Sequence, residues 1–404
     1  MFLYFCKKVT LLTMKYNFLQ NLYKGKYASD GVDWDFINTI PEMARLHECE
    51  QNPVWHSEGN AFQHTQLAYE KLDDAVFSKN IEDYFSLSHM ENLIIRASVV
   101  LHDIGKGVTT TQGKDGKWHA YGHEIEGEKI ARVLLWNEDF HVRETICALI
   151  RYHMEPLRIF DSKQWIYRMF EIAARVPWKY LYYVKMADLL GSVQLNGGTM
   201  SSDLQKMELI KDCAKSLNIW DSFDTNAMKN VIKYGNNRNI LPWKVNYDAN
   251  KVAYILIGLP GSGKNTVIRN SGIIPNIHAH ISRDDIRVHL GYCKPDEKYL
   301  GTPEEENEVT CVYNEQFQIA VDNGYTIVLN NVHLKKKYRD ASVSILRANG
   351  YKIVYIYVEA PTLEFNYQRR DGQIPADRIK AMALSFEWPE MTEYDELIIQ
   401  KQTY

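Results

Sequence analysis

Residues 252–266 read VAYILIGLPGSGKNT, and their pattern indicates the architecture of the C-terminal part of the chain. Its first six residues are apolar, which is typical of a short buried strand. Glycines then recur ahead of Lys264, as in a backbone loop that folds around phosphate oxygens before a helix begins. We therefore predict a nucleotide site, whose members are Gly258, Gly261, Ser262, Gly263, Lys264, Asn265 and Thr266.

Two more apolar runs follow the loop, at residues 325–329 and 352–358, with helical stretches between them. Alternation of strands and helices indicates a parallel sheet with helices on both faces. An α/β domain is therefore expected from residue 251 to residue 404.

The loop departs from the general pattern at one position. Lys264 is expected to reach the β- and γ-phosphates of a nucleotide, and the next residue is usually Ser or Thr, whose hydroxyl binds Mg²⁺. Here that residue is Asn265. An amide oxygen can coordinate Mg²⁺ or its water, so the pattern leaves open a catalytic site and a loop that only binds nucleotide.

The N-terminal part has a different texture. From about residue 34 to residue 220 the apolar residues recur at helical spacing, and strand-like runs are scarce. His102 and Asp103 stand next to each other on a predicted helix that begins near Glu91. Adjacent helical residues point about 100° apart, so a metal that both bind must lie beside this helix and take its other ligands from neighbouring helices. The candidates for those ligands are His64, His123, His153 and Asp188.

Imidazole and carboxylate ligands together suit a transition metal, and a bridging aspartate can hold two ions. The segment from residue 34 to 195 resembles the HD phosphohydrolase superfamily, in the version found beside tRNA nucleotidyltransferase domains. Residues 52–60, NPVWHSEGN, resemble the upstream motif of that version, in which His56 and Glu58 are expected to support the ligands.

The resemblance implies one or two divalent transition metal ions. It assigns His64, His102, Asp103 and Asp188 to the first ion and Asp103, His123 and His153 to the second. Asp103 and Lys106 would be catalytic, with Lys106 on the substrate phosphate.

A second resemblance follows from residues 281–287, ISRDDIR, which are similar to the strand-end motif of polynucleotide 5′-hydroxyl kinases. It implies that Asp284 accepts the proton of the attacking hydroxyl and that Arg287 binds the acceptor's phosphate. Residues 366–369, NYQR, resemble the lid motif of these kinases, so Arg369 is expected to stabilise the transferring phosphate and to bind the nucleotide. This family usually has an aspartate near the end of the strand at 325–329, where this chain has Asn330 and Asn331. We expect Asn331 to keep a hydrogen-bonding role.

We therefore predict two domains: an all-α HD-type domain at 34–220, followed by an α/β P-loop kinase domain at 251–404. An extension at 1–33 precedes them, with Met14 as a second candidate start. A turn-rich linker at 221–250 lies between them.

The composition of the chain limits its possible partners and cellular location. The 404 residues carry a formal net charge of -4, which argues against a broadly basic nucleic-acid coat but permits a local basic groove. The six cysteines form no CxxC pair, and no uncharged run approaches the ~18 residues of a membrane helix. We expect a cytoplasmic protein without a membrane partner.

Removal of phosphate by one domain and addition by the other predicts repair of broken RNA or DNA ends. The kinase would use ATP or another nucleoside triphosphate with Mg²⁺, and the HD-type domain would act on a 2′,3′-cyclic, 2′- or 3′-phosphate. A separate polynucleotide ligase would be the partner. Two alternatives remain: a nucleotide or nucleoside kinase fused to a nucleotidase for small molecules, and a non-enzymatic sensor of nucleotide, favoured only by Asn265 and Asn331.

Overall fold

The computed structural model of the chain describes residues 18–25, 31–73, 86–195, 199–222, 248, 250–270, 272–274, 276–294, 297, 299, 301–369 and 374–402. These residues fall into two compact units, one on each side of residues 238 and 239. The predicted linker at 221–250 lies largely outside the described residues, and so does much of the predicted extension at 1–33.

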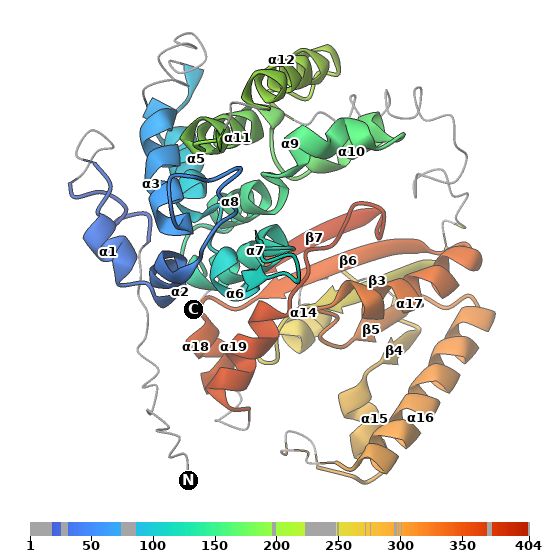
Figure 1. Cartoon of the computed structure of the whole chain (residues 1–404). Coiled ribbons are helices and arrows are strands. Elements are labelled where there is room, and N and C mark those ends of the chain that lie inside the picture. The colour runs from blue at the N-terminus through green and yellow to red at the C-terminus, as the bar shows by residue number, and fades with distance from the viewer. Residues whose placement is uncertain are drawn as a thin grey trace, which may run out of the picture. The chain divides into compact units, whose positions relative to one another are not determined.

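The first unit is helical, and it is drawn in blue to green in Figure 1. Its helices are α1 (Trp34–Asn38), α2 (Pro41–Ala44), η2 (Arg45–Glu48), α3 (Ala61–Lys71), α5 (His89–Leu101), α6 (Lys106–Thr109), α7 (His123–Leu134), α8 (Phe140–Tyr152), α9 (Glu155–Arg158), η4 (Ile159–Asp161), α10 (Trp165–Ala173), α11 (Trp178–Gly191) and α12 (Met200–Ser216). The one sheet among the described residues of this unit is a hairpin of two short strands, β1 (Thr111–Gln112) and β2 (Trp118–His119). The prediction of a helical N-terminal part is confirmed.

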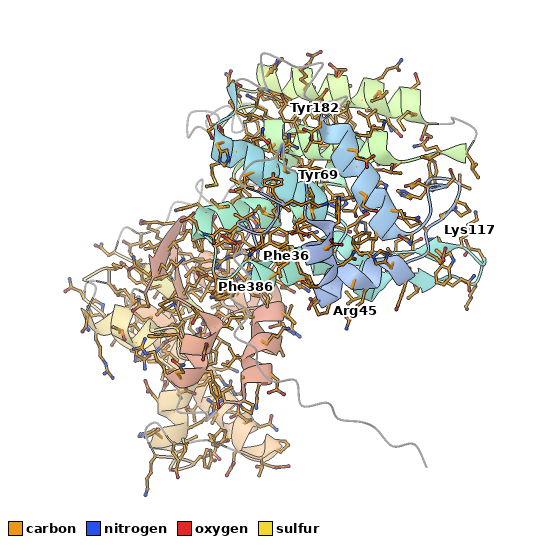
Figure 2. All side chains as sticks on the ribbon, turned by 90° about the vertical axis from the view of Figure 1, so that its left-hand side faces the viewer. Phe36, Arg45, Tyr69, Lys117, Tyr182 and Phe386 are labelled. Atoms are coloured by element: carbon orange, nitrogen blue, oxygen red, sulfur yellow. The ribbon has the colours of Figure 1, made fainter. Side chains whose placement is uncertain are left out.

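Helix α3 packs against α11, and α7 packs against α8. Gly191 allows the first approach, because a Cβ atom there would lie 2.6 Å from the Cα atom of Ala68. Tyr69 and Tyr182 are buried in this unit (Figure 2). The close packing of α3 on α11 fixes the distance between the functional side chains that these helices carry.

A buried ionic cluster joins α7 to α8. The guanidinium of Arg132 is fully buried and lies 2.7 Å from Glu128 and 3.0 Å from Glu144. Arg175 donates a second hydrogen bond of 2.9 Å to Glu128. Because a buried charge without its partner is strongly unfavourable, the cluster fixes the relative placement of the two helices.

The second unit is α/β. It contains β3 (Val252–Ile257), α14 (Lys264–Asn270), β4 (Ala279–Ile281), α15 (Arg283–His289), α16 (Pro303–Asp322), β5 (Ile327–Asn330), α17 (Lys336–Ala348), β6 (Lys352–Glu359), α18 (Leu363–Gln368), α19 (Ala376–Leu384) and β7 (Glu396–Lys401). Its five strands lie in the order β4-β5-β3-β6-β7, and every pair is parallel. The predicted parallel sheet is confirmed, with β3, β5 and β6 at the three predicted strands (Figure 1).

The apolar strand residues form the core of this unit, with Leu256, Val328 and Ile356 fully buried. Phe386, labelled in Figure 2, is also buried. Its ring stacks on Tyr357. Because the strands are parallel, the carboxyl ends of β3, β4 and β5 meet at one edge of the sheet. Among the described residues of both units, no helix is long and apolar enough to span a membrane.

Candidate metal centre and phosphate-binding loop

His102 and Asp103 lie just beyond the end of α5, which stops at Leu101. The helix begins at His89, close to the predicted start near Glu91, with Ser88 as its N-cap. The prediction that both residues belong to the helix is corrected by this end point. His102 is the C-cap of this helix and keeps helical backbone angles.

Three histidines of the centre are held in the same way. Nδ1 of each faces the carbonyl oxygen three residues earlier, at 2.7 Å for His102, 2.8 Å for His123 and 2.8 Å for His153. Such a bond places the proton on Nδ1 and leaves Nε2 as the ligand atom. Nε2 of His102 is buried and makes no hydrogen bond among the described residues, as expected for an atom that a metal would occupy.

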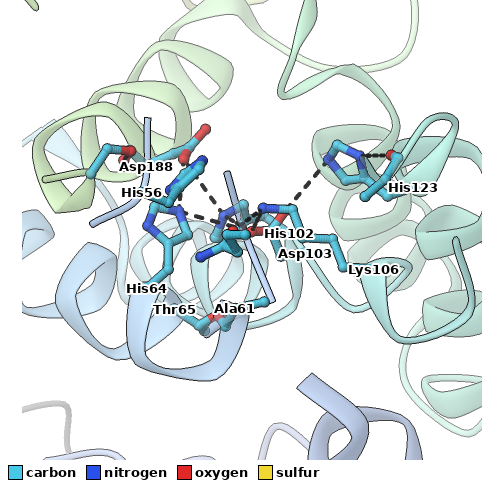
Figure 3. Close-up of polar contacts among 12 residues, drawn as sticks. His56, Ala61, His64, Thr65, His102, Asp103, Lys106, His123 and Asp188 are labelled. Carbon is cyan, nitrogen blue, oxygen red and sulfur yellow. Dashed lines mark hydrogen bonds and ion pairs between the residues drawn. The ribbon is translucent and has the colours of Figure 1, made fainter. Parts of the chain in front are cut away.

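The first group of side chains gathers around Asp188 (Figure 3). Nε2 of His64 lies 3.0 Å from Oδ1 of Asp188, and Nε2 of His102 lies 3.8 Å from the same oxygen. Oδ2 of Asp103 is 3.2 Å from His102. His64, His102 and Asp103 together form a compact, fully buried ligand set.

The second group lies on the other side of Asp103, where Figure 3 shows His123. Oδ1 of Asp103 is 3.4 Å from Nε2 of His123 and 4.0 Å from Nε2 of His153. The two imidazole nitrogens are 3.2 Å apart. Asp103 therefore belongs to both ligand sets, which is the arrangement of a carboxylate that bridges two ions.

The protonation states of four of the ligands suit metal binding, whereas burial would lower the pKa of His64 but Asp188 and Glu58 raise it to about 9. Burial would raise the pKa of Asp103, but His102 and Lys106 hold it well below its usual range. The pKa of Asp188 is likewise held low against burial, by Lys185 and His64. Burial lowers the pKa of His153 far below its ordinary value and lowers that of His123. Ionised carboxylates and neutral imidazoles are the forms that bind a divalent ion.

Two buried lysines complete the centre. Nζ of Lys106 lies 2.6 Å from Oδ2 of Asp103 and donates a 2.8 Å hydrogen bond to Gln51. Nζ of Lys185 lies 2.6 Å from Asp188. Sequence reasoning found Lys106 but missed Lys185, although its position one helical turn before Asp188 was the available signal.

Glu58 binds two histidines beside the centre. Its Oε1 atom accepts from Nδ1 of His56 and from Nδ1 of His64, each at 2.8 Å, and its Oε2 accepts from the backbone N–H of Val193. These bonds outweigh burial and lower the pKa of Glu58 to about 2. The predicted supporting role of His56 and Glu58 agrees with this placement, since Glu58 orients His64.

Position 105, two residues after Asp103, has no room for a side chain. A Cβ atom at Gly105 would lie 2.0 Å from the carbonyl oxygen of His123 and 2.6 Å from the backbone nitrogen of Gly127. The backbone before α6 therefore rests directly on the first turn of α7. This contact sets the position of His123 relative to Asp103.

In the second unit, the predicted phosphate loop connects β3 to α14. Nζ of Lys264 donates to the carbonyl oxygens of Gly258 and Leu259, both at 2.9 Å. Gly261 has φ of 76°, and a Cβ atom there would lie 2.5 Å from the carbonyl oxygen of Asn366. The loop therefore has the curled backbone that places N–H groups around an anion.

The lid residues reach the loop. Asn366, in α18, donates a 2.8 Å hydrogen bond to the carbonyl oxygen of Pro260. Arg369 follows this helix and lies 3.4 Å from the hydroxyl of Thr266. Arg369 thus lies beside the nucleotide loop, and its role on the transferring phosphate stays a prediction.

Asp284 and Arg287 lie one turn apart in α15, at the end of β4. Nη1 of Arg287 is 2.6 Å from Oδ1 of Asp284, and its Nε is 2.8 Å from Glu306 of α16. The Asp284 side chain is 70 % exposed, so a substrate can reach the carboxylate. Glu306 was not foreseen, because its contact depends on how α16 packs on α15.

Asn330 and Asn331, at the end of β5, make hydrogen bonds to different partners. Asn331 accepts a 3.2 Å hydrogen bond from the backbone N–H of Arg283, which agrees with the expected hydrogen-bonding role. Asn330, which received no role from the sequence, donates a 2.8 Å bond to Oδ1 of Asn265. The neighbour of the phosphate loop is therefore Asn330.

Comparison with known proteins identifies both units. Residues 64–226 match the family described as HD domain, and residues 254–389 match the family described as AAA domain. A search of the curated proteins finds no match. The chain thus joins an HD domain to a P-loop, kinase-like domain in the predicted order, which confirms the fold class and supports a fused phosphoesterase and kinase.

Proposed function

We propose that the chain is a bifunctional enzyme that heals broken ends of RNA or DNA. Its α/β unit phosphorylates a 5′-hydroxyl from a nucleoside triphosphate. Its HD unit removes or opens a 2′,3′-cyclic, 2′- or 3′-phosphate at the other end. The observation that carries this proposal is the pairing of Asp284 with Arg287 at the sheet edge that also holds the phosphate loop.

The proposed kinase activity is supported by the residues at the carboxyl edge of the sheet. The carboxylate of Asp284 can take the proton of an attacking hydroxyl, since it is ion-paired but exposed. Lys264 can leave its two carbonyl partners for phosphate oxygens, and Arg369 lies beside Thr266, two residues further along. Phosphoryl transfer needs positioning and charge neutralisation more than covalent chemistry, and these residues supply both.

The proposed phosphoesterase activity is supported by the Asp103 carboxylate, which belongs to both ligand sets. His64, His102, Asp103 and Asp188 would hold one divalent ion, and Asp103, His123 and His153 a second. Such ions supply Lewis-acid polarisation of a phosphoryl oxygen. Lys106 and Lys185 add two buried positive charges beside the ligands, which favours a phosphate substrate over a neutral one.

A polynucleotide acceptor is supported by Arg287. A guanidinium next to the general base can bind the phosphate that follows the terminal nucleoside. A nucleoside has no phosphate at that place. A separate polynucleotide ligase would then join the healed ends.

The test compares acceptors for the kinase and substrates for the hydrolase. A 5′-hydroxyl oligonucleotide, a 3′-mononucleotide and a nucleoside are each offered with labelled ATP at several salt concentrations. We expect the oligonucleotide to have the highest kcat/KM and a steep loss of affinity as salt rises. Preference for the mononucleotide or nucleoside with little salt dependence would instead support a small-molecule kinase and nucleotidase.

A further inference from the structure

The loop residue Asn265 is part of a hydrogen-bonded chain of side chains. Asn330, the last residue of β5, pairs in register with Leu256 of β3, two residues before the loop begins. Its Nδ2 atom donates to Oδ1 of Asn265 at 2.8 Å. Asn330 is buried, whereas Asn265 is exposed at the loop.

His280 and Asp285 fix the orientation of the Asn330 amide. Nδ1 of His280 lies 3.3 Å from the carboxylate of Asp285, which favours a proton on Nδ1. Nε2 of His280 is then an acceptor, and it lies 3.1 Å from Nδ2 of Asn330. Burial lowers the pKa of His280, which keeps the ring neutral. Both N–H bonds of the Asn330 amide therefore have acceptors.

The orientation of the Asn330 amide determines the orientation of the Asn265 amide. Since Asn330 presents donors, Asn265 must turn its oxygen inward, and its NH₂ group remains for a ligand. The general loop pattern has a hydroxyl on Mg²⁺ with an acidic residue at the neighbouring strand end. Two neutral amides bonded to each other do not fit that role, because the Asn265 oxygen is turned toward the buried Asn330 and the negative charge is missing.

We propose that Asn265 binds the nucleotide phosphate directly through its amide N–H groups, in place of a protein-held Mg²⁺. Asn330 and His280 are the positioning residues that hold this amide in its donating orientation. Nucleotide binding then depends on Lys264, Arg369 and Asn265, and it gains little from the metal. The inference rests on the proposed kinase function of the same site.

The experiment measures ATP binding to the full chain by calorimetry, once with Mg²⁺ and once with EDTA. For the native chain we expect the two Kd values to agree within about threefold, which is under 1 kcal/mol. The isosteric change Asn330→Asp should reverse the chain of bonds, since a carboxylate accepts from Asn265 and turns its oxygen outward. The ratio of Kd in EDTA to Kd in Mg²⁺ should then rise by at least about tenfold.

Asn331→Asp is the matched control. It adds the same charge one residue away and keeps an acceptor for the backbone of Arg283, so its ratio should stay near the native value. A native ratio above about threefold, or an unchanged ratio in Asn330→Asp, overturns the inference. Absence of ATP binding under both conditions would refute the kinase function as well, and thus separates the two failures.

Discussion

The two oxygens of the Asp103 carboxylate face different histidines, and Oδ1 lies 3.4 Å from Nε2 of His123. The other oxygen lies 3.2 Å from His102. One side chain thus closes both ligand sets, and neither set is complete without it. This relationship makes the centre a single unit whose parts can be tested by metal content.

Metal stoichiometry is the first prediction. After loading with Mn²⁺ and dialysis, the native chain should retain two metal equivalents, because Asp103 can bridge two ions. Asp103→Ala should retain none, and His153→Ala should retain one. The exposed His141→Ala serves as the control and should match the native chain. A native chain that retains only one equivalent, with the same content in His153→Ala, would contradict the two-ion centre.

The glycine after the metal ligand gives the second prediction. Gly105→Ala should displace His123, since the added Cβ meets backbone atoms of α7 at 2.0 and 2.6 Å. Metal content should fall by about one equivalent, and phosphoesterase activity should fall with it. Gly107→Ala is the control, because its Cβ would lie no closer than 3.1 Å to the side chain of Arg45 and 3.4 Å to the carbonyl oxygen of Glu42. Equal metal content in the two variants would argue against this role of Gly105.

The phosphate loop gives the third prediction. Gly261→Ala forces a left-handed residue at φ of 76° and places Cβ 2.5 Å from the backbone of Asn366. Calorimetry should show loss of ATP binding. Gly272 shares the left-handed conformation, with φ of 63°, but has open space around it. Gly272→Ala should therefore keep ATP binding at a stability cost of about 1 kcal/mol, and loss of binding there would show that backbone strain alone is responsible.

Contact with a polynucleotide gives the fourth prediction. Arg287→Ala should raise KM for a 5′-hydroxyl oligonucleotide more than it lowers kcat. It should also reduce the slope of log affinity against log salt by about one, as expected for one lost phosphate contact. Arg283 is the control, because it pairs with the same Glu306 but also donates to Thr310 inside the unit. If Arg283→Ala and Arg287→Ala changed the slope equally, Arg287 would have no special place at the acceptor.

Acid stability gives the fifth prediction. Burial would raise the pKa of Glu128, but Arg175 and Arg132 lower it from the ordinary 4.5 to about 2. The stabilisation is therefore complete above pH 4.5 and is lost as the pH falls toward 2. Glu128→Gln should lower the free energy of unfolding at neutral pH by about 3–5 kcal/mol and flatten its dependence on acid pH. Glu126→Gln, whose ion pair with Lys129 is partly exposed, should do neither in urea denaturation at a series of pH values.

Much of the site could be predicted because its chemistry is carried by short local motifs. The glycine spacing before Lys264 requires a tight loop wherever it follows a buried strand. The order of the motif residues in the chain predicts six ligands, and the structure brings all of them together: His64, His102, Asp103, His123, His153 and Asp188.

What could not be predicted depends on packing between elements. The end of α5 at Leu101 could not be predicted, because the helical spacing continues to His102. The choice between Asn330 and Asn331 depends on strand register, since a shift by one residue sends a side chain to the other face. Glu306 and Lys185 became visible only when their helices were placed beside Arg287 and Asp188.

Whether the chain has two end-healing sites is tested most directly with one RNA oligonucleotide that carries a 5′-hydroxyl and a 2′,3′-cyclic phosphate. The oligonucleotide is incubated with ATP, Mg²⁺ and Mn²⁺, and the products are resolved by mass. The native chain should add phosphate at the 5′ end and hydrolyse the 3′ end. Asp284→Ala should lose only the first change, and Asp103→Ala only the second. No change at either end, or loss of both activities in one of these variants, would contradict two independent end-healing sites.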